Sequence, residues 1–310
     1  MTFHTPVMIK EVLDALRCKR GGIYLDGTVG GGGHAYEILK KTAPDGLLVG
    51  IDFDDEALAE AEERLRGFGK RKILVKGNYA EMANILALLN IKFVDGILLD
   101  LGVSAHQLED AKRGFSFSLE APLDMRMDRN RSFTARDLVN NYSESELEKI
   151  IRNYGEEKMA GRIARAIVKK RNAATILTTA DLAAVVTGAM PPGYARQKIH
   201  PATRTFQAIR IVVNDELINL PRAIKSGIEV LNTGGRLVVI SFHSLEDRIV
   251  KNEFRYWEKA CICPPHSPVC SCRRKALLKV LTKKPVIPGN EEIKANLRAR
   301  SARMRTAERL

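Results

Sequence analysis

Short apolar runs, each closed by a polar residue, alternate with amphipathic segments along the first third of the chain. A continuous apolar run is typical of a strand covered on both faces, and apolar residues repeated every three or four positions are typical of a helix. Amphipathic segments such as 9–16 and 55–66 therefore predict helices. The expected strands cover residues 23–26, 46–52, 72–76, 94–101 and 235–242. Strands that alternate with helices indicate an α/β fold with a parallel sheet.

The fourth and fifth expected strands are separated by far more residues than one crossover helix needs. Within this gap, several pairs of residues match the capping box that starts a helix. The pairs are Thr134 with Asp137, Ser143 with Glu146, and Thr178 with Asp181. We therefore expect a small inserted helical domain over residues 110–200, which interrupts a sheet domain made of 1–109 and 201–310.

Four consecutive glycines, 30–33, follow the first expected strand, and a helical segment begins at Ala35. Glycine allows positive φ angles and lets a ligand approach bare backbone, so this arrangement predicts a nucleotide-binding unit. The spacing of Gly30, Gly32 and Ala35 also fits the dinucleotide pattern G-x-G-x-x-A. Asp26 favours a different ligand, because a carboxylate there would repel a pyrophosphate but attract the ammonium and sulfonium groups of S-adenosylmethionine.

Polar residues also follow the next three expected strands, as Asp52, Tyr79 and Asp100. Asp52 lies about 20 positions beyond the glycine loop, the offset at which a carboxylate accepts hydrogen bonds from ribose hydroxyls. The ring of Tyr79 could stack on adenine or pack at the edge of the core. Because parallel strands present their carboxyl ends at one edge, we expect all of these side chains to converge there with Asp26.

The composition predicts a globular chain with a polyanionic partner. Of the 310 residues, 45% are hydrophobic, which is enough for a substantial core. No apolar run of about 18 residues occurs, and the first residues lack the pattern of an export signal, so we expect no membrane span and a cytoplasmic protein. Lys and Arg number 50 against 37 Asp and Glu, a formal net charge of +13. This excess favours nucleic acid as partner, although a basic surface kept for solubility would give the same balance.

The last segment, 296–310, is rich in arginine and is expected to be a helix or a tail. Spread arginines fit contacts to RNA phosphates, which position RNA without reading its sequence, and a solvated basic end is the alternative. The arginines concerned are Arg298, Arg300, Arg303, Arg305 and Arg309.

Two C-x-C pairs, Cys261 with Cys263 and Cys270 with Cys272, lie close together in a cysteine-poor chain. Disulfides are not expected in a reducing compartment. These thiols could hold a structural zinc ion, but zinc sites usually have two to four residues between paired cysteines. The pattern therefore favours reduced thiols without a ligand, and no metal site is predicted.

Separate motifs along the chain resemble those of the MraW/RsmH family, bacterial S-adenosylmethionine-dependent methyltransferases that act on cytosine N4 of small-subunit (16S) ribosomal RNA. The motifs are DGTVGGGGH (26–34), DLGVS (100–104), PLDMRMD (122–128), HPATRTFQAIR (200–210) and SFHSLEDR (241–248). The resemblance implies a class I, Rossmann-like methyltransferase fold with a helical insertion for substrate recognition, and a cytosine of the decoding region as the methyl acceptor. It also implies cofactor contacts at Gly32, Gly33, His34, Asp52, Tyr79, Asp100 and Gln107.

The exocyclic amine of cytosine is a poor nucleophile because its lone pair is delocalised into the ring, so a catalyst must accept hydrogen bonds from it. Asp100 is the predicted catalytic residue. Residues 101–103 differ from the Asp-Pro-Pro-aromatic loop of many amino methyltransferases, so other side chains must hold the base. The candidates are Asp124, Arg126, Ser241 and His243, and His243 fits a core histidine equally well.

The expected partner is small-subunit ribosomal RNA in an assembled or nearly assembled particle. One alternative is a DNA or small-molecule methyltransferase of the same fold, which would gain little activity from ribosomal subunits. Another is an RNA-binding assembly protein without turnover. The acids Asp26, Asp52 and Asp100 beside a glycine loop argue against this second alternative.

Overall fold

The computed structural model describes residues 6–118, 120–192, 194, 199–263 and 271–310. The chain divides into two compact units, which we call the sheet unit (Met1–Gly102 and Leu217–Leu310) and the helical unit (Val103–Glu216). The bounds expected for the insertion, 110–200, fall inside the helical unit. Within the described part of the chain, no helix is both long and apolar enough to cross a membrane.

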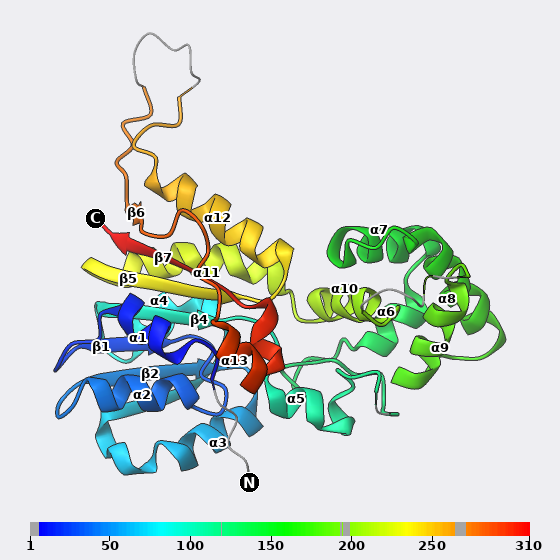
Figure 1. The fold of residues 1–310 in the computed structure, drawn as a ribbon, viewed down its shortest axis with the longest axis horizontal. Helices are drawn as coiled ribbons and strands as arrows, with labels where there is room; N and C mark the ends of the chain where they lie inside the picture. Colours follow the sequence, from blue (N-terminus) through cyan, green and yellow to red (C-terminus); the bar gives the residue numbers. More distant parts are fainter. Residues whose placement is uncertain (1–5, 119, 193, 195–198, 264–270) are drawn as a thin grey trace. The chain divides into compact units, whose positions relative to one another are not determined.

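The sheet unit contains a seven-stranded sheet in the order β3-β2-β1-β4-β5-β7-β6 (Figure 1). The strands are β1 (Ile23–Asp26), β2 (Leu47–Asp52), β3 (Lys72–Lys76), β4 (Val94–Asp100), β5 (Leu231–Ser241), β6 (Leu278–Val280) and β7 (Arg303–Arg309). Neighbouring strands from β3 through β5 are parallel, and β7 is antiparallel to both β5 and β6. The predicted α/β fold is thus confirmed. The strand order reverses between β1 and β4, which is where doubly wound sheets bind their ligands.

Helices cover both faces of this sheet. They are α1 (Ile9–Leu16), α2 (Gly33–Lys41), α3 (Asp55–Arg64), α4 (Met82–Leu88), α11 (Glu216–Val230), α12 (Ser244–Glu258) and α13 (Asn290–Ala295). Successive side chains of a strand point to opposite faces, so Ile97 and Leu99 of β4 join one core with α4, α11 and α12. Leu98 between them joins a second core with α1, α2 and α3. Burial on both faces explains why these strands read as continuous apolar runs.

The C-terminal segment differs from its prediction, because residues 303–309 form β7 rather than a helix or a tail. Arg305 is buried, and its guanidinium donates to both carboxylate oxygens of Asp247 on α12, at 2.6 and 3.1 Å. Arg309 donates to the backbone carbonyls of Ile228 and Leu277. The predicted phosphate contact is therefore wrong for the buried Arg305, and that of the half-buried Arg309 stays a prediction.

The helical unit has its own apolar core. Its helices are α5 (Ala105–Glu109), α6 (Ala135–Asn141), α7 (Glu144–Gly155), α8 (Ala160–Ala173), α9 (Thr179–Ala189) and α10 (Thr203–Val213). The predicted capping boxes are present at Thr134, Ser143 and Thr178, which begin α6, α7 and α9. The sequence alone was sufficient to predict these helix starts, because each cap satisfies backbone N–H groups within its own first turn.

Candidate functional site

The glycine loop joins β1 to α2, and its shape depends on left-handed backbone at Gly30 and Gly32, with φ angles of 50° and 77°. Gly32 also packs closely on α3, since a Cβ atom there would lie 3.3 Å from Cα of Ala61. The N–H of Gly30 donates to Asp52 at the end of β2, at 2.8 Å. Conformation and close packing together require glycine at these positions, and Gly33 then begins α2.

Asp26 and Asp52 end adjacent strands, and backbone donors hold both carboxyls. Asp26 accepts from the N–H of Thr28 at 3.2 Å, and Asp52 accepts from the N–H groups of Gly30 and Asp54. Burial raises the pKa of Asp26 to about 7, and the neighbouring charge of Asp52 contributes to this rise. Burial also raises the pKa of Asp52 to about 6. Such a pair favours a ligand that brings positive charge or hydrogen-bond donors.

Asp100 at the end of β4 lies beside His34, the second residue of α2. His34 is buried, and its Nε2 must carry a proton because it lies 2.8 Å from the carbonyl oxygen of Val7. Nδ1 of His34 faces Asp100 Oδ2 at 3.6 Å, so a proton on either group makes this contact attractive. Asp100 Oδ1 is enclosed and has no hydrogen-bond partner among the described residues. Burial raises the pKa of Asp100 well above its usual range, and the charges of Asp26 and Glu246 raise it further.

Thr28 and Glu246 support this site and were not among the predicted residues. The hydroxyl of Thr28 accepts the backbone N–H of Asp100 at 2.7 Å, which joins the glycine loop to β4. Glu246 accepts the N–H of Phe242 at 2.8 Å and closes a capping box with His243 at the start of α12. In the sequence, Glu246 lies three positions after His243, which is the spacing of a capping box, although histidine is an unusual residue at a helix N-cap.

Tyr79 begins a 3-10 helix, Tyr79–Glu81, directly after β3, and its side chain is buried. Its ring meets Phe53 edge to face, with the ring centroids 6.0 Å apart. The Cβ atom of Tyr79 lies 3.1 Å from the position that a Cβ on Gly27 would occupy, so Tyr79 packs closely against the end of β1. Packing is therefore one role of Tyr79, and stacking on adenine stays a prediction.

Three further predicted residues belong to the helical unit. Gln107 closes a capping box, since its Oε1 accepts the N–H of Ser104 at 3.0 Å. The guanidinium of Arg126 donates two hydrogen bonds to the carboxylate of Asp124, of 2.8 and 2.7 Å. Burial acts to raise the pKa of Asp124, but the hydrogen bonds from Arg126 outweigh it and lower that pKa. Each side chain thus has a structural partner in its own unit, and the ligand contacts of all three stay predictions.

Ser241 ends β5 in the sheet unit, and His243 follows that strand. The hydroxyl of Ser241 is buried and donates to the carbonyl of Arg303 at 3.2 Å. His243 accepts the N–H of Glu246 at Nδ1, at 3.4 Å, so Nε2 carries the proton of the neutral ring. This enclosed Nε2 has no hydrogen bond within the described structure, although Glu246 Oε1 lies 3.3 Å away. The Nε2–H group of His243 therefore has no hydrogen bond of good geometry within the described structure.

A cavity of about 310 Å³ opens beside His243. Ser244, Pro288 and Ile293 line it, together with two exposed arginines, Arg300 and Arg303. Arg303 also lies 3.6 Å from Asp247, but Arg305 already neutralises that carboxylate through two shorter contacts. The cavity thus combines an apolar wall with positive charge.

The cysteines of the C-x-C pairs lie on the segment that follows α12. Cys261, Cys263 and Cys272 come together there, and Cys270 lies outside the described residues. Hydrogen bonds from Ser271 lower the pKa of the Cys263 thiol. Their arrangement is taken up below.

The reversal of strand order, the glycine loop and the acids at three strand ends define a nucleotide-binding α/β protein of the doubly wound class. A model of the MraW methylase family matches residues 1–310. The chain is 59% identical over 309 residues to "Ribosomal RNA small subunit methyltransferase H" of Syntrophus aciditrophicus, covering 100% of this chain and 98% of that protein. The protein of the same name from Geobacter sulfurreducens is 54% identical over 311 residues, with 100% of both chains covered. The chain belongs to the MraW methylase family, which confirms the resemblance seen in its motifs and the class I methyltransferase fold that it implied.

Proposed function

We propose that this protein transfers a methyl group from S-adenosylmethionine to the exocyclic N4 of a cytosine in the decoding region of small-subunit ribosomal RNA. Relatives that match it over their full length carry the name ribosomal RNA small subunit methyltransferase H. The structural observation that carries the proposal is the enclosed Oδ1 atom of Asp100, which has no hydrogen-bond partner in the described residues. A ligand amine would supply the missing donor.

The acids that end β1, β2 and β4 in the sheet unit suit the chemical groups of the cofactor. S-adenosylmethionine supplies an electrophilic methyl group on a positively charged sulfonium, and it also carries an ammonium group. Asp26 and Asp100 bring two carboxyls to the point where the strand order reverses, and a cationic ligand would favour their ionised forms. Asp52 is the proposed acceptor of hydrogen bonds from ribose hydroxyls. We assign the cofactor contacts to Gly32, Gly33, His34, Asp52, Tyr79, Asp100 and Gln107.

Asp100 also acts on the acceptor amine. Its carboxylate accepts a hydrogen bond from N4, which keeps the nitrogen lone pair directed at the methyl carbon. With the methyl donor bound, N4 would become acidic as it takes the methyl group, and the carboxylate of Asp100 would accept its proton. His34 lies 3.6 Å from Asp100 Oδ2 and orients this carboxyl. Such transfer depends on positioning more than on the strength of an acid or base.

We assign the cavity beside His243 to contacts with the RNA substrate. Arg300 and Arg303 line it and suit phosphate contacts, and His243 lines the same cavity. Among the predicted base-holding residues, His243 is favoured, because Ser241 and the Asp124–Arg126 pair already have hydrogen-bond partners. The helical unit remains the proposed substrate-recognition domain.

Replacing both Arg300 and Arg303 by alanine is expected to weaken RNA binding and to reduce its salt dependence. Each lost phosphate contact lowers the slope of log affinity against log salt by about 0.7 to 0.9, so the double variant should lose about 1.5. Binding of small ribosomal subunits at several salt concentrations measures this slope. Arg20→Ala is a control, because Arg20 is exposed just before the amino end of β1, whereas the cavity lies next to residues that follow the carboxyl end of β5. Equal slopes for the wild type and the double variant would rule out these phosphate contacts.

We further propose that the substrate is an assembled or nearly assembled small subunit, and that the protein acts in the cytoplasm, where such particles are found. The cavity and the net charge of +13 suit a large polyanion. Comparing intact subunits with deproteinised RNA as methyl acceptors tests the state of the substrate, since free RNA should then be the poorer acceptor.

Transfer of labelled methyl from S-adenosylmethionine to small subunits, taken from a strain that lacks this protein, tests the proposed function. Mass analysis of the nucleosides should show N4-methylated cytidine. Equal labelling of DNA or of free cytidine would instead indicate another acceptor class. Cofactor binding by calorimetry without any transfer to subunits would also contradict the proposal.

A further inference from the structure

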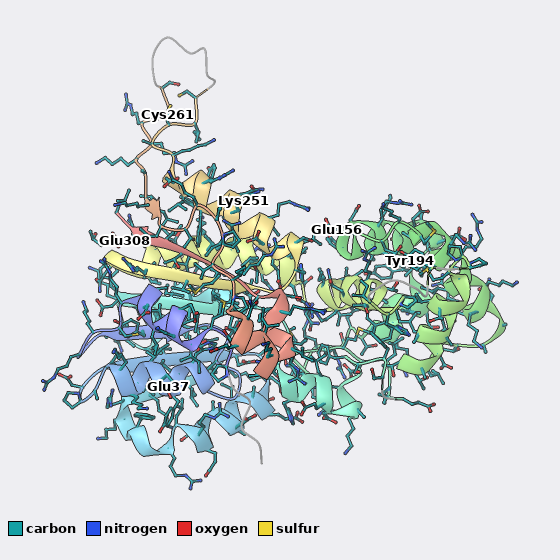
Figure 2. All side chains as sticks on the ribbon, viewed as in Figure 1. Glu37, Glu156, Tyr194, Lys251, Cys261 and Glu308 are labelled. Atoms are coloured by element: carbon teal, nitrogen blue, oxygen red, sulfur yellow. The ribbon has the colours of Figure 1, made fainter. Side chains whose placement is uncertain are left out.

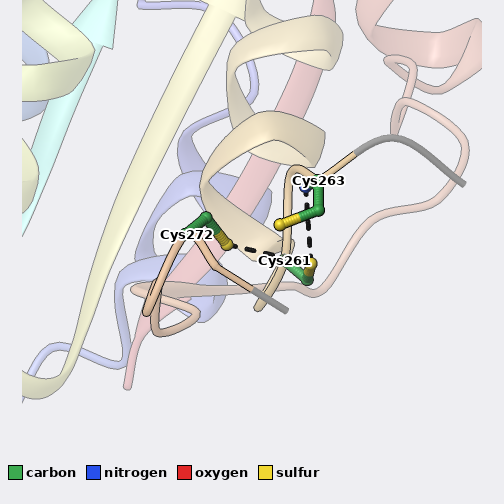
Figure 3. A group of neighbouring side chains, drawn as sticks. All are labelled: Cys261, Cys263 and Cys272. Carbon is green, nitrogen blue, oxygen red and sulfur yellow. Dashed lines mark hydrogen bonds between the residues drawn. The ribbon is translucent and has the colours of Figure 1, made fainter. Parts of the chain in front are cut away.

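Three cysteine side chains meet on an arm that extends beyond α12. Figure 2 shows Cys261 on this arm, away from Lys251 on the helix itself. Cys261 and Cys263 follow the helix, and Cys272 lies on the segment that returns toward β6. The three Sγ atoms all lie within 4.8 Å of one another, with Cys261 and Cys272 only 3.8 Å apart (Figure 3). Residues nine or more positions apart in sequence thus share one small volume.

The spacing of the sulfur atoms matches a tetrahedral metal site. A zinc–sulfur bond of about 2.3 Å and tetrahedral angles place two thiolate ligands of one ion about 3.8 Å apart. A disulfide would need the sulfur atoms at about 2.05 Å and would use two of the three thiols. Three converging sulfur atoms are therefore better explained by a shared ion than by a pairwise bond.

The base of the arm is held by contacts that involve no sulfur. The guanidinium of Arg274 lies 3.9 Å from the ring centre of Tyr256 and donates to the carbonyl of that residue at 2.7 Å. The N–H of Leu277 donates to the carbonyl of Trp257 at 2.9 Å. Both contacts fasten the returning segment to the end of α12, so the thiols are brought together before any ion binds. A site preorganised in this way loses less conformational entropy on binding.

Polar groups around the sulfur atoms suit bound thiolates. The N–H of Cys263 donates to Cys261 Sγ at 3.4 Å, and the hydroxyl of Ser271 lies 3.7 Å from Cys263 Sγ. Such outer contacts orient ligands and offset their negative charge. Cys261 is exposed, which leaves a path for an ion to enter.

We propose that Cys261, Cys263 and Cys272 bind one zinc ion that fastens the two sides of the arm together. Thiolate ligands select zinc over hard cations such as magnesium or calcium. Each thiol gives up its proton as it binds the ion, so the three sulfur atoms and the ion form a centre with net negative charge. Arg273, Arg274 and Lys275 next to Cys272 place positive charge beside that centre. The spacing in sequence disfavoured such a site, and the convergence of the sulfur atoms in space favours it.

Metal analysis of the purified full-length chain tests this inference. We expect about one equivalent of zinc per chain, because three thiolates converge on one ion. After zinc removal under reducing conditions, added Co²⁺ should give the thiolate-to-cobalt charge-transfer band and the visible bands of a tetrahedral site. Cys261→Ser, Cys263→Ser and Cys272→Ser should each lose most of the bound metal. Cys18→Ser is the matched control, since Cys18 lies apart from the cluster and burial raises its pKa to about 12.

Thermal unfolding should be little changed in the arm variants, because the arm lies outside both apolar cores of the sheet unit. In limited proteolysis, the arm of the wild type should be cut faster after zinc is chelated. The arm of Cys272→Ser should be cut at that faster rate even without a chelator. The inference is overturned if the wild type binds no more Co²⁺ than the Cys272→Ser variant. Loss of two free thiols without bound metal would overturn it as well, in favour of a disulfide.

Discussion

Asp100→Asn is expected to reduce methyl transfer to small ribosomal subunits by about a hundredfold or more, the usual cost of losing a directed polar group in an active site. The amide keeps the shape of the side chain but cannot take a proton from the acceptor amine. The variant should fold at least as well as the wild type, because it removes a buried charge near Asp26 and Glu246. Single-turnover rates at saturating cofactor measure the chemical step, and calorimetry gives cofactor affinity separately.

Asp95→Asn is the matched control for this prediction. Asp95 lies on the same strand toward its amino end, where it accepts the N–H of Ile23 and pairs with Lys19. Its substitution should lower stability slightly and leave the transfer rate unchanged. If Asp100→Asn transferred methyl at the wild-type rate, Asp100 would not be catalytic. If it bound subunits normally and supported their function without transfer, RNA binding would be the primary role of the protein.

The convergence of the strand-end acids was predictable because it follows from strand direction. Asp26, Asp52 and Asp100 each close an apolar run, and parallel strands bring such ends to one edge. The glycine loop and the helix caps depend on neighbours in sequence, so they too were visible. These features need no knowledge of which distant segments pair.

Features that depend on distant partners were not predictable in the same way. Arg305 resembles a solvated tail residue until β7 pairs antiparallel with β5 and brings it to Asp247, 58 positions away. The cysteines gather beyond the point where Arg274 stacks on Tyr256, a contact 18 positions apart in sequence that no local pattern indicates. Asp124 and Arg126 are only two positions apart, yet their mutual hydrogen bonds also escaped the sequence analysis, because alternating charges fit a ligand site equally well.

Cofactor affinity is expected to rise as the pH increases from about 5.5 to about 8, through the pKa values of Asp52 and Asp26, which are about 6 and about 7. Both carboxyls must lose a proton before they can attract the sulfonium and ammonium groups or accept hydrogen bonds at full strength. Cofactor binding should therefore release protons near pH 7, which calorimetry in buffers of different ionisation enthalpy detects. Affinity that did not change with pH would contradict a role for these acids.

Asp26→Asn is expected to weaken cofactor binding about tenfold or more at pH 8, as for the loss of a charge-assisted contact, and to have a smaller effect near pH 5.5. The amide oxygen can still accept the N–H of Thr28, so the glycine loop should keep its shape. The same substitution is expected to increase stability, although it weakens cofactor binding. The folded-state pKa of Asp26, about 7, lies above the ordinary value of an aspartate, so the ligand-free wild type loses free energy of unfolding as the pH rises from about 4 to about 7. The variant should lack this loss and unfold at a higher temperature than the wild type at pH 8. A variant that was both less stable and poor at binding at every pH would indicate a structural role for Asp26 instead.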